Sequence, residues 1–157
     1  ETDGETFPAA IGWHPWFRRV LTGTPDRAAP TSAPAQLQLE AGRMYERGSD
    51  GLPTGLLVPP SAGPWDDCFT DLHSPPRIVW PDRLALSLTS TCDHWVVYTE
   101  PEQAICVEPQ TDPPDAVHLE PRVVLPGSPL TASMTWHWWP LSAGAGDGSG
   151  GGESRLR

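Results

Sequence analysis

Three short strings of the sequence carry residue types suited to acid–base chemistry. His14 stands in Gly-Trp-His-Pro-Trp-Phe, Glu108 in Cys-Val-Glu-Pro-Gln, and Asp66 and Asp67 in Trp-Asp-Asp-Cys-Phe. An imidazole titrates near neutral pH, and burial can bring the pKa of a carboxyl group toward the same range. One histidine and one carboxylate can therefore move protons in both directions near neutrality. The two adjacent aspartates add acceptors for hydroxyl groups.

The neighbouring residues restrict the backbone conformation of His14 but do not indicate its function. Pro15 restricts the backbone of His14 to extended conformations, and Gly12 lets another part of the chain approach closely. Taken alone, the string favours a half-buried histidine in an aromatic cluster. A structural interpretation is also given to the other histidines of the chain, His73, His94, His118 and His137.

Both carboxylate strings also have plain structural interpretations. Strand alternation places Glu108 on one face with Cys106 and Gln110, but a solvated glutamate on an edge strand gives the same pattern. Asp66 and Asp67 would point to opposite faces of a strand, so that one accepts hydrogen bonds from ligand hydroxyls while the other caps a turn. An Asx turn explains the pair equally well. No clustered histidine or third carboxylate accompanies them, so no metal is expected.

The elements that would hold these side chains are predicted to be strands. The chain has 20 prolines and 15 glycines, and no long helical stripe of apolar residues survives between them. Apolar and polar residues alternate over 84–89 and 130–138. We therefore predict an all-β, antiparallel β-sandwich over residues 1–140. Residues 141–157 are predicted to form a disordered Gly/Ser-rich tail.

Composition narrows the range of partners. The 157 residues suffice for one domain with a hydrophobic core, and the net charge of −10 disfavours binding to nucleic acid. No run of about 18 apolar residues is present in the sequence, so no membrane span is predicted. Cys68, Cys92 and Cys106 are spaced for neither a disulfide framework nor a zinc knuckle, which favours reduced thiols in a cytoplasmic protein.

Together and in this order, the three strings resemble the aldose 1-epimerase (galactose mutarotase-like) family. The resemblance covers roughly residues 7–139, and its most specific part is the Glu-Pro-Gln…Pro-Asp-Ala string at 108–116. It implies a galactose mutarotase-like supersandwich. Members of the family are longer and carry a further arginine and histidine in their N-terminal half. The resemblance therefore implies that this chain is the C-terminal portion of the fold.

The resemblance also implies a role for each candidate residue. His14 corresponds to the general acid toward the sugar ring oxygen, and Glu108 to the general base at the anomeric hydroxyl. Asp66 corresponds to the residue that holds sugar hydroxyls, with Trp65 as the aromatic residue beside it; a slip of one residue would transfer the role to Asp67. The implied reaction interconverts the α and β anomers of a hexose by ring opening and reclosure, with no cofactor or metal.

The sequence departs from the family pattern after the first string. Arg18 and Arg19 stand where galactose mutarotases of the family have Asn-Leu. If these arginines contact the substrate, they favour a sugar with an anionic group, such as a hexose phosphate. If they are instead a solvated pair at the end of a strand, they indicate no particular sugar. Two alternatives to an enzyme stay open, namely a non-catalytic carbohydrate-binding β-sandwich and an inactive truncated fragment. The sequence leaves the oligomeric state undetermined.

Overall fold

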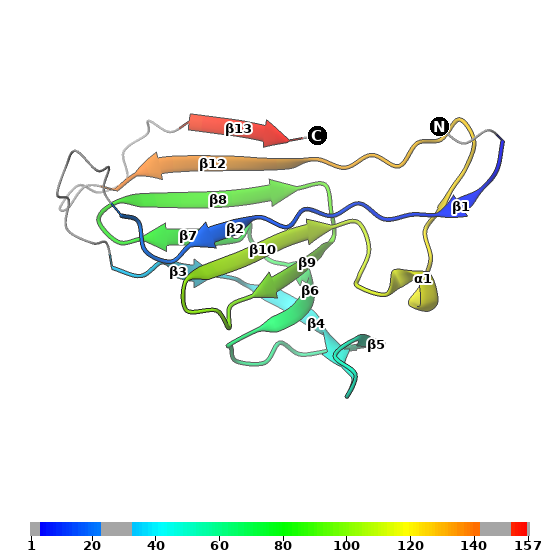
Figure 1. Cartoon of the computed structure of the whole chain (residues 1–157), viewed down its shortest axis with the longest axis horizontal. Helices are drawn as coiled ribbons and strands as arrows, with labels where there is room; N and C mark the ends of the chain where they lie inside the picture. The colour runs from blue at the N-terminus through cyan, green and yellow to red at the C-terminus, as the bar shows by residue number, and fades with distance from the viewer. Residues whose placement is uncertain (1–3, 23–32, 142–151, 157) are drawn as a thin grey trace.

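Short extended segments, separated by proline- and glycine-rich turns, pair into antiparallel sheets. The computed structural model describes residues 4–22, 33–141 and 152–156 of the chain. Two larger sheets and a two-stranded ribbon make up the fold (Figure 1). The predicted all-β, antiparallel sandwich is confirmed.

The sheet that concerns the candidate site has six strands. Their order across the sheet is β2 (Trp16–Arg18), β10 (Ala104–Gln110), β9 (His94–Tyr98), β6 (Asp66–Leu72), β4 (Ala41–Arg47) and β5 (Pro53–Val58). All neighbouring strands are antiparallel. β2 and β5 form the two edges, so β10 and β9 lie inside the sheet, where both their sides are hydrogen-bonded.

The second large sheet has five strands. Their order is β13 (Gly152–Leu156), β12 (Met134–Pro140), β8 (Leu84–Ser90), β7 (Arg77–Trp80) and β3 (Gln36–Gln38). The ribbon joins β1 (Phe7–Pro8) to β11 (Val123–Val124) and lies near the short helix α1 (Ala116–Leu119), at one end of the molecule (Figure 1). Among the described residues, no helix has the length and apolar character needed to cross a membrane.

The C-terminal segment differs in part from the expected tail. Residues 142–151 lie outside the described residues. Residues 152–156 form β13, which pairs with β12 from Met134↔Leu156 to Trp138↔Gly152. The segment expected to be a tail therefore includes one paired strand.

The interior of the sandwich is aliphatic and aromatic. Ile78 and Leu88 from one sheet and Ile105 and Val107 from the other are 0–1% exposed and belong to one cluster. The cluster explains the alternation in β10, where odd-numbered apolar residues face the second sheet. Its packing fixes the position of β10, and β10 carries Glu108.

Truncation of a central core side chain tests this packing. Leu88 lies on β8 and is 0% exposed. We expect Leu88→Ala to lower the free energy of unfolding by about 2–5 kcal/mol, because it removes apolar contacts and leaves a cavity. Urea denaturation measures the change. Leu56→Ala is the control, since Leu56 is 60% exposed on β5, and it should change stability by less than about 0.5 kcal/mol; equal losses in the two variants would contradict the assignment of this core.

Candidate active site

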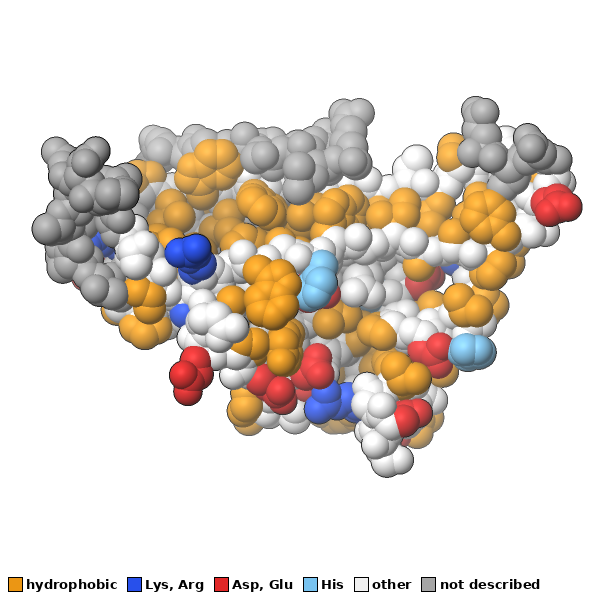
Figure 2. Space-filling view, in the orientation of Figure 1, with side chains coloured by type: hydrophobic (Ala, Val, Ile, Leu, Met, Phe, Trp, Pro, Cys, Tyr) orange, Lys and Arg blue, Asp and Glu red, His pale blue; other side chains and the backbone are white. Residues whose placement is uncertain are grey.

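Strand register gathers the candidate side chains on one side of the six-stranded sheet. Residues directly opposite each other on neighbouring strands point to the same face. Four such partners form a row across β2, β10, β9 and β6: Trp16, Cys106, Tyr98 and Asp66. Glu108 lies two residues from Cys106 on β10 and points the same way. We call this side the open face, as distinct from the side that packs on the core. On the face of the molecule seen in Figure 2, a histidine, hydrophobic side chains and acidic side chains gather near the middle.

His14 and Glu108 are in direct contact. Nδ1 of His14 lies 2.5 Å from Oε1 of Glu108. The histidine side chain is 63% exposed, whereas the glutamate side chain is 8% exposed. The pair therefore has one accessible member, the imidazole, above a carboxylate that is almost withdrawn from water.

Backbone pairing with β10 puts His14 over Glu108. The amide of Trp13 donates to the carbonyl of Pro109 at 3.1 Å, and Gly12 forms an antiparallel bridge with Gln110. A Cβ on Gly12 would lie 3.0 Å from Cγ of Gln110, so a glycine suits this close approach. The segment before β2 thus continues the β2–β10 ladder through His14 to Gly12.

A polar network of the buried Thr111 and Asp112 and the exposed Arg122 holds the start of this segment. Ile11 and Thr111 exchange two hydrogen bonds, from Ile11 N to Thr111 Oγ1 at 3.0 Å and from Thr111 N to Ile11 O at 2.8 Å. Thr111 Oγ1 also donates to Asp112 at 2.5 Å, and Nε of Arg122 donates to both carboxylate oxygens of Asp112 at 3.1 Å. These three residues fix the chain that leads to His14. Sequence reasoning missed them, because only the folded structure places Ile11 beside Thr111.

The environment of Glu108 raises its pKa. The largest cause is burial, which disfavours the charged form, and the nearby carboxylate of Asp66 acts in the same direction. The adjacent His14 and a hydrogen bond from Cys106 oppose this rise but do not cancel it. A carboxylate with a raised pKa is a stronger base, as proton abstraction near neutral pH requires.

His14, Cys106 and Glu108 also carry atoms that can bind a metal ion. Nitrogen, sulfur and oxygen ligand atoms of His14, Cys106 and Glu108 all lie within 4.8 Å of one another. Nδ1 of His14 and Oε1 of Glu108 lie 2.5 Å apart, which is a hydrogen-bond distance. It is shorter than the separation of two atoms that each bind one tetrahedral zinc ion at about 2.0–2.2 Å. We therefore describe the group as hydrogen-bonded rather than as a metal centre.

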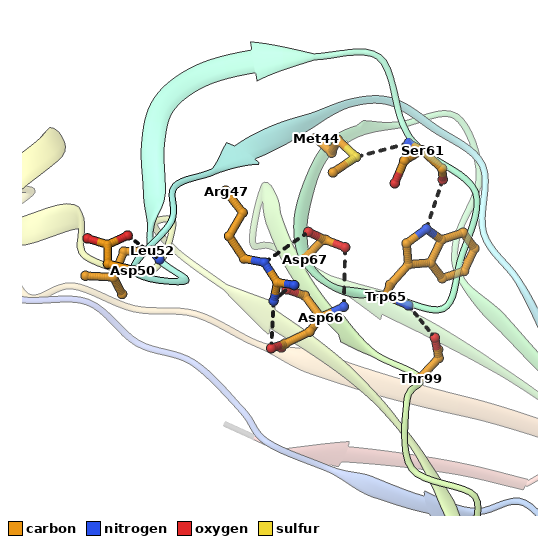
Figure 3. Close-up of polar contacts among 9 residues, drawn as sticks. All are labelled: Met44, Arg47, Asp50, Leu52, Ser61, Trp65, Asp66, Asp67 and Thr99. Carbon is orange, nitrogen blue, oxygen red and sulfur yellow. Dashed lines mark hydrogen bonds and ion pairs between the residues drawn. The ribbon is translucent and has the colours of Figure 1, made fainter.

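Asp66 lies on the open face and is bound by an arginine. Nη1 of Arg47 donates to Oδ2 and to the backbone oxygen of Asp66, both at 2.9 Å, and its Nε lies 4.0 Å from Oδ1 of Asp67 (Figure 3). These residues line a pocket of about 150 Å³. Val96 also lines the pocket and is the β9 partner of Glu108, so the pocket adjoins the His14–Glu108 pair.

Trp65 does not lie with these groups. Its Nε1 donates to the carbonyl of Ser61 at 2.9 Å (Figure 3), and its ring meets Phe69 edge-on at 5.5 Å, against an interior cluster. The aromatic ring beside His14 is instead Trp16, which is 50% exposed and 5.6 Å from the imidazole, centroid to centroid. Trp16 in turn lies 6.1 Å from Tyr98. The sequence does not predict that Tyr98 belongs to the candidate site, because its position beside Asp66 depends on the β6–β9 register.

The two arginines after the first string have different surroundings. Arg19 donates from Nε to the carbonyl of Pro101 at 2.9 Å and from Nη2 to that of Thr99 at 2.5 Å. It therefore ties β2 to the turn between β9 and β10. Arg18 is exposed on β2, two residues from Trp16 and on the same face. Of these two arginines, Arg18 is the one that is placed to meet a ligand on the open face.

His94 has hydrogen-bond partners on both ring nitrogens. Its Nδ1 lies 3.2 Å from the carbonyl of Thr111, and its Nε2 lies 3.1 Å from the hydroxyl of Tyr45. Because a carbonyl only accepts, we assign the proton to Nδ1 and let Tyr45 donate to Nε2. This bonding agrees with the structural interpretation of His94.

The architecture matches a solved structure. The crystal structure of a galactose mutarotase-like protein from Clostridium acetobutylicum superimposes with a TM-score of 0.67 over 89% of this chain, at 13% identity. The chain has a galactose mutarotase-like fold. It covers 49% of the solved chain, so it spans about half of that protein's length. No protein-family model and no curated protein matches the sequence. At this identity the likeness shows the mutarotase-like fold alone.

The raised pKa of Glu108 predicts a pH-dependent effect on stability. Its carboxyl group binds a proton more tightly in the folded protein than in the unfolded chain, where the ordinary pKa is 4.5. The stabilisation by the protonated form is complete below that value and is lost as the pH rises through the folded pKa. Glu108→Gln should therefore gain stability relative to the parent protein as the pH rises above 4.5. Denaturation at about pH 4 and about pH 8 measures the difference.

Glu102→Gln provides the control for this experiment. Glu102 is exposed in the turn between β9 and β10, away from the His14–Glu108 contact. The stability difference between this variant and the parent protein should change less between the two pH values than that of Glu108→Gln. A difference for Glu108→Gln that changes no more than that of Glu102→Gln would contradict the raised pKa.

Proposed function

We propose that this chain carries the acid–base pair of an aldose 1-epimerase-like isomerase, which interconverts the α and β anomers of a hexose or a related sugar. The observation that supports this most directly is the 2.5 Å contact between His14 Nδ1 and Glu108 Oε1, on the same face as Asp66. The mutarotase-like fold adds support. The pairing supplies an accessible acid and a base of raised pKa side by side, and anomer exchange requires both.

In the proposed ring opening, the Glu108 carboxylate removes the proton from the anomeric hydroxyl oxygen O1. The electron pair of that O–H bond forms the aldehyde C=O as the bond from C1 to the ring oxygen O5 breaks. Protonated His14 donates a proton to O5 from Nε2, since Nδ1 faces Glu108. Each transfer contributes a factor of about 10²–10⁴.

Ring closure reverses these transfers on the other face of the aldehyde. After rotation about the C1–C2 bond, the O5 hydroxyl attacks C1 and returns its proton to His14. Glu108 gives its proton back to O1. The pair then has its starting protonation state, so the cycle consumes neither acid nor base.

The proposed sugar lies across the open face between the acid–base pair and Asp66. Tyr98 on β9 lies between β10 and Asp66, and Trp16 on β2 lies beside His14 and meets the ring of Tyr98. Aromatic faces pack well against the C–H groups of sugar rings. Asp66 and Arg47 supply an acceptor and a donor for hydroxyl groups in the adjoining pocket. We also propose a cytoplasmic location, since all three cysteines are free thiols.

Polarimetry on freshly dissolved α-glucose and α-galactose tests the proposal. The protein should accelerate the change in optical rotation, and His14→Gln or Glu108→Gln should each lower kcat by about 10²–10⁴-fold. The control is His137→Gln, because His137 is exposed on β12 in the other sheet. A parent protein that binds sugar in calorimetry without accelerating rotation would instead be a carbohydrate-binding module.

The exposed Arg18 predicts a preference between substrates. If the sugar carries an anionic group, Arg18→Gln should lower the ratio of kcat/KM for glucose 6-phosphate over glucose by about 3- to 10-fold, as expected for an exposed charge-assisted contact. Arg43→Gln is the matched control, since Arg43 is exposed on β4, at the far side of the same sheet. An unchanged ratio in Arg18→Gln would point to neutral hexoses.

A further inference from the structure

Cys106 occupies a closed position directly beside Glu108. It is 0% exposed although its side chain lies on the open face. Its partners in the register are Trp16 on β2 and Tyr98 on β9, whose rings meet edge-on at 6.1 Å. The thiol is thus enclosed between neighbouring strands, with the carboxylate of Glu108 two residues along β10.

We propose that Cys106 is a positioning residue, whose thiol donates a permanent hydrogen bond to Glu108 and fixes the orientation of the catalytic carboxylate. The sulfur lies within 4.8 Å of the ligand atoms of both Glu108 and His14. Because the thiol is fully buried, its hydrogen cannot bond to water, and the carboxylate of Glu108 is a nearby acceptor. This inference deepens the proposed function and rests on it, because the catalytic role of Glu108 is part of that proposal.

Protonation fixes the direction of the hydrogen bond. Burial raises the pKa of Cys106 to about 12, so the sulfur keeps its hydrogen at every working pH and donates to the carboxylate. His14 bonds to Oε1 of Glu108 from the solvent side. Two donors on different sides restrict rotation of the carboxylate, and the proposed reaction requires one of its oxygens to be aimed at O1.

The thiol also tunes the base. Within the described part of the chain, three titratable groups act on Glu108: His14 before β2, Cys106 on β10 itself and Asp66 on β6. His14 and Cys106 favour the charged carboxylate, whereas Asp66 and burial disfavour it. Without the thiol, one of the two compensating contacts would be lost, and Glu108 would stay protonated to a higher pH.

Three variants separate this role from simple packing. Cys106→Ala removes the donor, and Cys106→Ser replaces it by a hydroxyl donor of similar size. Cys68→Ala is the matched control, because Cys68 is also buried, lies on β6 of the same sheet, and likewise has a pKa raised to about 12. Titration of the side-chain carboxyl of Glu108 by carbon-13 NMR gives its pKa without any need for activity. The pH profile of kcat from polarimetry gives the catalytic readout.

In Cys106→Ala, we expect the pKa of Glu108 and the acidic limb of the profile to rise together by about 0.5–1 pH unit, as for the loss of one weak donor to a charged group. Cys106→Ser should restore most of the shift, and Cys68→Ala should show none. An unchanged pKa of Glu108 in Cys106→Ala, or an equal rise in Cys68→Ala, would overturn the proposal. A parent protein without mutarotation would contradict the proposed function, while the NMR titration would still decide the hydrogen bond.

Discussion

The antiparallel pairing of residues 11–18 with β10 is the constraint on which the candidate site depends. It places His14 over Glu108, and it also sets Trp16 opposite Cys106. Because side chains alternate along a strand, a register shift of one residue would turn the imidazole away from the carboxylate. The network of Thr111, Asp112 and Arg122 opposes such a shift, since it holds the beginning of the paired segment. The geometry of the site is therefore a property of the sheet rather than of a flexible loop.

Burial on β10 gives the glutamate its chemical character. A carboxylate on an exposed edge strand would keep an ordinary pKa, but Glu108 lies on an interior strand and is covered by the segment that carries His14. The covering imidazole limits the cost of burial because it supplies a donor at the point of closest approach. One strand pairing thus brings the two side chains together, buries the carboxylate of Glu108 and leaves the imidazole of His14 exposed.

The sequence was sufficient to predict the sandwich, because alternation and turn residues are local signals. A common site for His14 and Glu108 could be expected only from the resemblance that the three strings carry together, since residues so distant in the chain meet only through the sheet. Trp65 and Trp16 show the limit: both flank polar groups, but Trp65 bonds to Ser61 and packs inward while Trp16 stays at the site. The difference depends on register, which composition does not encode. Arg18 and Arg19 could not be separated for the same reason, because only the fold shows that Arg19 binds the β9–β10 turn.

The candidate side chains come from two separate pairs of neighbouring segments, and this arrangement determines what a substitution on each pair would change. The proposed acid–base pair lies before β2 and on β10, whereas Arg47 and Asp66 lie on β4 and β6, with β9 between the two groups. Under the proposed function, substitutions on β4 and β6 would change the contacts with sugar hydroxyls without displacing the backbone that holds His14 and Glu108. Asp66 would connect the two effects, because its carboxylate also contributes to the raised pKa of Glu108.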